Sequence, residues 1–241
     1  MWPNSKKKII TKETLDLFLT DLAKAFRRLN GRQAKAELVL VGGTAVLTNY
    51  SFRESTSDMD AVINTTSSLE DAIKQVSEKY DIPGDWLNDD VKKTASFTYR
   101  LIEFSTYYKT YSGVIEVRAL RGQYLIAMKL KSGREYKNDL SDILGILMEQ
   151  KQQGKPLSFS DVDQAMIALY GSWDDVPEFS LSFIKDCFAS KNYAVDYEKT
   201  LSLEKDNRKK LQDFQRDYPD ILLGVNASEV LKALREKKEK K

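Results

Sequence analysis

One segment, Leu38–Ile63, constrains the fold of this chain more than any other. Its first four residues form an apolar run typical of a buried strand, which Gly42 and Gly43 interrupt at once. Thr44–Tyr50 then reads as a short helix, and Ser57–Ile63 as a second apolar strand. The succession of strand, glycine turn, helix and strand predicts an α/β fold.

Two carboxylates, Asp58 and Asp60, stand at alternate positions of the second strand. Side chains alternate between the faces of a strand, so both carboxylates point to the same side. Like charges this close repel unless a hard cation lies between them, and aspartate oxygens are ligands that Mg2+ prefers. The pair therefore predicts a metal site. The alternative interpretation is a solvated surface, which is more common for an isolated Asp-x-Asp.

The turn at Gly42 and Gly43 predicts an anion site. It offers unobstructed backbone N–H groups and the positive end of a helix dipole, both suited to a phosphate. Two glycines after a strand also occur in ordinary turns. An anion site followed by a metal site, with an apolar strand on each side, favours a nucleoside triphosphate as the ligand.

The composition narrows the chemistry that such a site can perform. The 241 residues contain no histidine, which excludes a Ser-His-Asp triad, a Cys-His dyad and a histidine-ligated zinc site. Acid–base work is left to carboxylates, lysine, tyrosine or a metal-bound water. The single cysteine, Cys187, excludes an internal disulfide framework and fits a reducing cytosol.

Charge and hydropathy indicate little about partners. The net charge of +2 is too small to indicate nucleic acid by itself. No apolar run approaches the length of a membrane span, and the N-terminus lacks the apolar core of a signal peptide. We therefore expect a cytoplasmic protein with no membrane partner.

The glycine turn and the acid pair together resemble the signature of the nucleotidyltransferase fold. The residues that carry the resemblance are Gly42, Gly43, Thr44, Arg53, Thr56, Asp58 and Asp60. Within that superfamily the chain resembles the AbiEii and MenT-like toxin-type nucleotidyltransferases. The resemblance implies a small mixed sheet of the polymerase-beta type with flanking helices in residues 1–122, and a helical domain in residues 123–241. Thr44 stands where serine is more usual, and it keeps the hydroxyl.

The rest of the chain continues the alternation and then becomes helical from about residue 140. An aromatic and basic run, Thr106–Tyr111, suits either single-stranded nucleic acid or ordinary strands and half-buried turns, and we favour the second interpretation. The remaining elements of the first half are a helix from Thr11 to Gly31, a helix at Ser67–Tyr80 and strands at Phe97–Phe104 and Gly113–Leu120.

Glu116 is the candidate for a third carboxylate. It lies in the middle of the last predicted strand, on the same face as Val114 and Arg118. Many nucleotidyltransferases carry a third acid on a later strand, so the resemblance implies that Glu116 completes the metal site. An ion pair between Glu116 and an arginine such as Arg118 is an equally weighted alternative.

The segment Tyr124–Ile143 resembles the second diagnostic element of the toxin-type group. The resemblance implies that Lys129 reaches the phosphates of the nucleotide, and that Asp139 and Asp142 orient this lysine or join the rim of the site. On physical grounds, Lys129 in an apolar helical turn either extends to solvent or is held for an anion. The nearby Arg134 favours the second.

We therefore expect a metal-dependent enzyme that moves a nucleoside monophosphate from a nucleoside triphosphate to an acceptor hydroxyl. Asp58, Asp60 and Glu116 are the expected ligands of two Mg2+ ions, with Mn2+ as the alternative ion. Lys129 joins these three acids as an expected catalytic residue. The expected nucleotide-binding residues are Gly42, Gly43, Thr44, Arg53, Ser57, Lys129, Arg134 and Asp139.

The acceptor is not defined by the residues themselves. The resemblance implies RNA, with a tRNA 3′ end as one candidate, and a role as the toxin of a toxin–antitoxin or phage-defence pair with a cognate antitoxin protein. A second class of function is a non-catalytic antitoxin or sensor that binds a nucleotide or RNA on the same fold.

Overall fold

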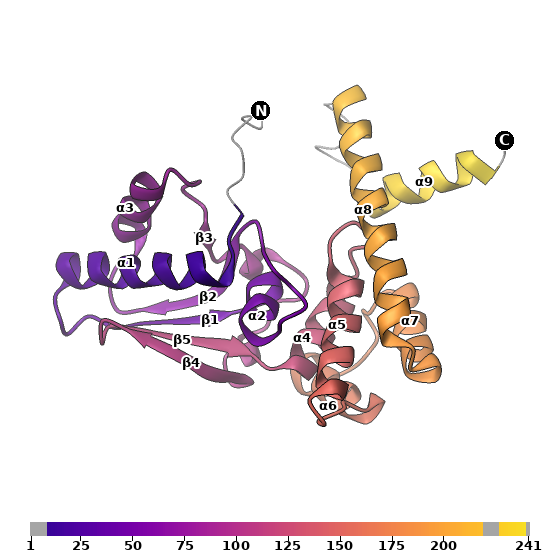
Figure 1. Cartoon of the computed structure of the whole chain (residues 1–241), viewed down its shortest axis with the longest axis horizontal. Helices are drawn as coiled ribbons and strands as arrows, with labels where there is room; N and C mark the ends of the chain where they lie inside the picture. The colour runs from indigo at the N-terminus through magenta and orange to yellow at the C-terminus, as the bar shows by residue number, and fades with distance from the viewer. Residues whose placement is uncertain (1–8, 219–226, 240–241) are drawn as a thin grey trace. The chain divides into compact units, whose positions relative to one another are not determined.

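The computed structural model describes residues 9–218 and 227–239 (Figure 1). These residues form two compact units. The first holds the described residues up to Met128 together with Ser160–Trp173, and the second holds Lys129–Phe159 and the described residues from Asp174 onward. The units divide within helix α4 (Gly122–Ser132), whereas the sequence places the boundary between residues 122 and 123.

Five strands form one mixed sheet in the first unit, in the order β3-β2-β1-β5-β4. β1 pairs antiparallel with β2 and parallel with β5, while β3 and β4 are the two edges. This confirms the predicted small mixed sheet. The strands are β1 (Ala36–Leu40), β2 (Met59–Thr65), β3 (Leu87–Asn88), β4 (Ser105–Tyr111) and β5 (Ile115–Leu120).

Helices flank the sheet, as predicted. α1 and α3 lie side by side over the sheet (Figure 1), and Phe18 of α1 packs against Tyr80 and Trp86. The predicted N-cap of α1 is confirmed, because the Thr11 hydroxyl accepts from the backbone N–H of Thr14. The helices are α1 (Lys12–Asn30), α2 (Gly42–Asn49), α3 (Glu70–Tyr80) and α6 (Phe159–Tyr170), with α4 crossing into the second unit.

The predicted strand at Phe97–Phe104 is wrong. The chain instead forms a short 3₁₀ helix, η2 (Tyr99–Leu101), because the Thr98 hydroxyl accepts from the N–H of Arg100 and starts a turn. The strand begins at Ser105 and contains the aromatic and basic run, whose tyrosines suit a pleated surface. A second 3₁₀ helix, η1 (Asp90–Lys93), follows β3.

The second unit is helical, which confirms the predicted class of the C-terminal region. Within it, the most extensive helix packing is between α5 and α8. A small apolar cluster of Leu211, Val230 and Leu231 joins α8 to α9. None of the helices in residues 9–218 and 227–239 is long and apolar enough to cross a membrane. The helices are α5 (Asp139–Gln152), α7 (Glu178–Ser190), α8 (Tyr193–Asp217) and α9 (Ala227–Glu239).

Candidate functional site

The two glycines after β1 allow side chains to approach the backbone closely. Gly42 has a φ of +53°, in the left-handed region that favours glycine, and a Cβ there would lie 3.5 Å from Oδ2 of Asp60. A Cβ on Gly43 would lie 2.8 Å from Nη2 of Arg53 and 3.0 Å from Oγ1 of Thr56. The turn therefore has room for Arg53 only because residue 43 has no side chain.

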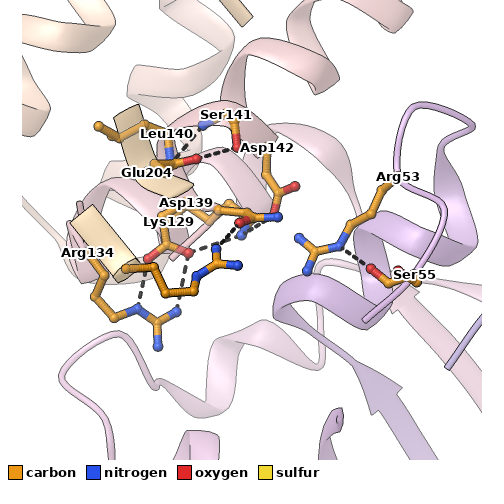
Figure 2. Close-up of polar contacts among 11 residues, drawn as sticks. Arg53, Ser55, Lys129, Arg134, Asp139, Leu140, Ser141, Asp142 and Glu204 are labelled. Carbon is orange, nitrogen blue, oxygen red and sulfur yellow. Dashed lines mark hydrogen bonds and ion pairs between the residues drawn. The ribbon is translucent and has the colours of Figure 1, made fainter. Parts of the chain in front are cut away.

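Backbone donors converge at the same turn. α2 begins at Gly42, and its N-cap residue, Val41, makes no side-chain capping bond. The first N–H groups of a helix have no acceptor within the helix, and they carry the positive end of its dipole. Arg53 adds a full positive charge, and its Nε donates to the carbonyl of Ser55 at 3.1 Å (Figure 2). The predicted anion site thus has its donors and its cation together.

The acid pair lies directly beside this turn. Asp58 immediately precedes β2, Asp60 is its second residue, and both are half-buried. The carbonyl of Asp60 accepts from the N–H of Val41 at 3.1 Å, which ties the start of β2 to the residue before the glycines. The structure therefore brings Gly42, Gly43, Asp58 and Asp60 together, as the sequence predicts.

Two residues that were expected to bind the nucleotide instead contact Asp58. The hydroxyl of Thr44 is buried and donates to the carbonyl of Asp58 at 3.1 Å. The exposed Ser57 donates its hydroxyl to Oδ1 of Asp58 at 3.0 Å. Ser57 therefore holds the carboxylate of Asp58, and Thr44 holds its backbone.

Glu116 does not join the acid pair. The strand register places Glu116 beside Glu37, and Glu37 beside Asn64 of β2. Asp60 lies four residues before Asn64, so at about 3.3 Å per residue the two acids are offset by about 13 Å along the strands, in addition to the two strand spacings between them. Glu116 accepts from Nη1 of Arg118 at 3.2 Å. Glu116 lies on the same face of the sheet as Asp60, but the register places it too far away to share a metal ion with the acid pair. The alternative interpretation, an ion pair with Arg118, therefore agrees with the structure.

Asn88 is a residue of this site that the sequence did not reveal. β3 pairs in parallel with β2 and aligns Asn88 with Asp60, which places the two side chains on the same face. Its amide is held by bonds to the carbonyl of Asp85 and the N–H of Asp90. A strand of two residues has no detectable periodicity, and only a partner strand defines it.

The side-chain oxygens at the start of β2 suit a hard cation. In the described ranges, no three or more histidine, cysteine, aspartate or glutamate side chains converge on one point. Mg2+ usually keeps several waters and takes one or two carboxylates together with the phosphates of a substrate. Asp58 and Asp60 fit this pattern of a site that the substrate completes, and Asn88 adds a neutral oxygen beside them.

The second unit holds a cluster of charges around Lys129 (Figure 2). This lysine is 4% exposed, and its Nζ lies 3.1 Å from Asp139 and 2.7 Å from Asp142. Arg134 donates to both oxygens of Asp139, at 2.8 and 3.2 Å. The expectation that both aspartates orient Lys129 agrees with these contacts. The expectation that Lys129 and Asp139 contact a nucleotide does not, because each is buried against opposite charge.

The charges of this cluster set the ionisation of Asp139. Burial alone would raise its pKa, but the cations of Lys129 and Arg134 outweigh burial and hold the pKa of Asp139 at about 2. One ammonium group and one guanidinium group at short range keep this carboxylate charged at neutral pH. The cluster is therefore a buried ion-pair network within one unit.

Glu204 of α8 caps the start of α5 (Figure 2). Its carboxylate accepts from the N–H of Leu140 at 2.8 Å and from the hydroxyl of Ser141. Burial, with a smaller contribution from the nearby Asp142, raises the pKa of Glu204 to about 7, against the hydrogen bonds from Leu140 and Ser141 that lower it. A cap supplied from 63 or 64 residues away has no local sequence signal.

The raised pKa of Glu204 predicts a pH-dependent stability. The folded state binds this proton more tightly than the unfolded state, so stability falls as pH rises from about 4.5 to 7. Glu204→Gln is expected to remove this dependence and to be more stable than the wild type at pH 8, by up to about 3 kcal/mol. Urea unfolding at pH 5 and pH 8 measures the difference.

Glu198, exposed on the same helix, supplies the control. Glu198→Gln should change unfolding by less than about 0.5 kcal/mol at either pH. A wild-type protein that is equally stable at pH 5 and pH 8, with Glu204→Gln matching it, would contradict the prediction.

Comparison with known proteins gives one match. The model of a family described as "nucleotidyltransferase of unknown function" (DUF6036) matches residues 18–153, which are more than half of the 241 residues. The matched range contains the glycine turn, Arg53, the acid pair, Asn88 and the Lys129 cluster up to α5. No curated protein and no solved structure matches the chain.

Proposed function

The chain belongs to the DUF6036 family of nucleotidyltransferases, and from this premise we propose that it transfers a nucleoside monophosphate from a nucleoside triphosphate to an acceptor hydroxyl in a Mg2+-dependent reaction. The observation that carries the proposal is the convergence of Arg53 and the Asp58–Asp60 pair on the Gly42-Gly43 turn. Membership of the family implies a nucleotide substrate, and this turn is the place where the chain can hold triphosphate oxygens.

Each residue of the site has a distinct part in the proposal. The N–H groups at the start of α2 and the guanidinium of Arg53 hold the β- and γ-phosphate oxygens. Asp58 and Asp60 hold the cation, which when bound offsets the charge of the transferring phosphoryl group. Thr44 and Ser57 keep Asp58 in place.

The transfer itself requires little covalent chemistry from the protein. The acceptor oxygen forms a bond to the α-phosphorus, the bond from that phosphorus to the bridging oxygen breaks, and pyrophosphate leaves. The acceptor's proton passes to a carboxylate of the acid pair, since the chain has no histidine to take it. Arg53 stabilises the charge that develops on the leaving pyrophosphate.

The finer identity of the substrates extends the proposal. We propose RNA as the acceptor and Mg2+ as the ion, with Mn2+ as a substitute, because the motif residues resemble the toxin-type group. The same resemblance supports action in the cytoplasm as the toxin of a toxin–antitoxin or phage-defence pair, and a cognate antitoxin as the protein partner.

A non-catalytic role is the second candidate, and the position of Glu116 favours it. With Glu116 about 13 Å away along the sheet, the acid pair has an amide, Asn88, in place of a third carboxylate at the neighbouring strand. A chain of this kind would bind a nucleotide without turning it over, as an antitoxin or sensor.

One experiment separates the two functions. Purified protein is incubated with Mg2+, total RNA and each of the four α-labelled nucleoside triphosphates in turn. The enzyme function predicts label on RNA with at least one of the four. Nucleotide binding without labelled RNA, protein or small hydroxyl compounds would replace it with the sensor function.

A glycine substitution tests the anion site directly. In Gly43→Ala the new Cβ would meet the Arg53 guanidinium at 2.8 Å and displace it from the turn. Loss of a charge-assisted contact to phosphate is expected to weaken triphosphate binding about tenfold, with little change in stability. Calorimetric titration with ATP and Mg2+ measures this loss.

The matched control for that variant is Gly84→Ala. A Cβ at Gly84 would meet nothing within 4 Å, so ATP affinity should equal that of the wild type. Unchanged affinity in Gly43→Ala would show that Arg53 does not act at the phosphates.

A further inference from the structure

A pair of stacked rings lies at the end of the sheet in the first unit. Phe104 immediately precedes β4, and Tyr124 is in the first turn of α4, directly after β5. Their ring centroids are 4.1 Å apart and their planes differ by 8°. Both side chains are half-buried, so each ring is partly packed against the protein and partly accessible to solvent.

Two arginines lie over these rings. The guanidinium carbon of Arg121 is 4.9 Å from the ring centre of Tyr124, and that of Arg100 is 5.9 Å from the ring centre of Phe104. Nε of Arg121 donates to the backbone carbonyl of Phe104 at 3.1 Å. Because this acceptor is neutral, the bond does not neutralise the charge of the guanidinium. Arg100 is exposed.

A further exposed ring, that of Tyr99, directly precedes Arg100 in η2. Tyr99 is 73% exposed, although its ring meets Phe97 edge-on at 5.0 Å. A large aromatic side chain held by a neighbour and open to solvent is suited to stacking with a ligand. We call these six residues the aromatic–arginine cluster: Phe97, Tyr99, Arg100, Phe104, Arg121 and Tyr124.

Arg121 of the cluster lies at the same end of the sheet as the glycine turn. β1 and β5 are parallel neighbours, with Leu40 beside Ala119, so Gly42 and Arg121 each follow the same end of adjacent strands. Adjacent strands are about 4.8 Å apart. Asn49, the last residue of α2, donates to the carbonyl of Leu120 at 2.9 Å and ties the end of this helix to the end of β5.

We propose that the aromatic–arginine cluster binds the acceptor, and that the acceptor is the end of a single-stranded nucleic acid. This proposal rests on the proposed nucleotidyl transfer. Bases stack on Tyr99 and on the accessible part of the Phe104–Tyr124 pair, while Arg100 and Arg121 contact backbone phosphates. Rings and guanidinium groups bind single strands in this way because every base has a π face and every phosphate linkage carries a negative charge.

Binding of a labelled single-stranded RNA oligonucleotide, followed by fluorescence anisotropy without nucleotide, tests the proposal. Tyr99→Ala is expected to weaken binding about tenfold, as loss of one stacked base does. Arg100→Gln is expected to weaken it and to reduce the slope of log affinity against log salt by about one. Single-stranded DNA and duplex RNA of the same sequence are run beside it, and duplex RNA should bind more weakly.

Two exposed residues outside the cluster supply controls. Tyr107 is 60% exposed on β4, and Lys93 is exposed on η1. Tyr107→Ala and Lys93→Gln should keep the affinity of the wild type. A wild-type protein that binds no single strand, or controls that lose as much affinity as the cluster variants, would overturn the proposal.

A parallel titration with Mg2+ and each of the four nucleoside triphosphates separates this proposal from the proposed function. If the wild type binds none of the four, the proposed function fails, whatever the oligonucleotide result. If a triphosphate binds normally and Tyr99→Ala leaves oligonucleotide binding unchanged, only the acceptor surface fails. If Tyr99→Ala weakens binding of that triphosphate instead, the cluster holds its nucleobase, and the proposal is overturned.

Discussion

Asp60→Asn is expected to lower nucleotidyl transfer about a thousandfold or more. The substitution keeps the size of the side chain beside Gly42 but removes the negative charge that holds the cation, and that cation supplies several kcal/mol of stabilisation to the transition state. The free energy of unfolding should stay the same or rise slightly, since one of two neighbouring like charges is removed. Initial rates with saturating ATP and denaturant unfolding of the same preparation measure both.

Glu116→Gln is the matched control for this variant. It makes the same change of carboxylate to amide, on the same face of the same sheet, two strands away from Asp60 and offset by about 13 Å along the strands. Its rate is expected to lie within about a factor of three of the wild type, because Glu116 lies away from the acid pair and its partly exposed ion pair with Arg118 contributes little. If Glu116→Gln falls as far as Asp60→Asn, Glu116 belongs to the site after all.

The core of the site was predictable because it is local in sequence. Gly42 and Asp60 are joined by one helix and one connector, so the order of elements alone returns the second strand to the side of the first. The alternation of a strand then gives the shared face of Asp58 and Asp60. The contact of Arg53 with Gly43 lies within the same short segment.

The rest of the site depends on pairing between distant strands. The sequence predicts the face of Glu116 correctly, but the register of β5 against β1 sets its distance along the sheet, and a single strand contains no information on register. Asn88 escaped prediction for the related reason that its strand is defined by β2. Glu204 shows the same limit for helices, because its partners lie at the start of α5.

The Lys129 segment shows that spacing can predict which residues meet without predicting what their charges contact. The short separation of Lys129 from Asp139 and Asp142 predicts that they meet. Whether a lysine serves a ligand or its own aspartates depends on burial, which follows from packing over the whole unit. The contacts at 3.1 and 2.7 Å assign this lysine to its aspartates.

Lys129→Met is expected to destabilise the second unit by about 3–5 kcal/mol. Methionine fills a similar volume, so the loss comes from charge: the substitution removes the cation 2.7 Å from Asp142 and one of the two cations beside Asp139. Both aspartates are buried, and a buried carboxylate without its cation is strongly penalised. Denaturant unfolding followed by circular dichroism at pH 7 measures the change.

Lys93→Met is the control that separates the loss of a buried cation from the loss of an exposed lysine. Lys93 lies 2.6 Å from Asp90, but both side chains are exposed, so the expected cost is below about 1 kcal/mol. Asp142→Asn in the Lys129→Met background should recover part of the lost stability, because it removes a buried carboxylate that lost the Lys129 cation. A double variant that is no more stable than Lys129→Met alone would mean that packing of the lysine stem, not its charge, stabilises this unit.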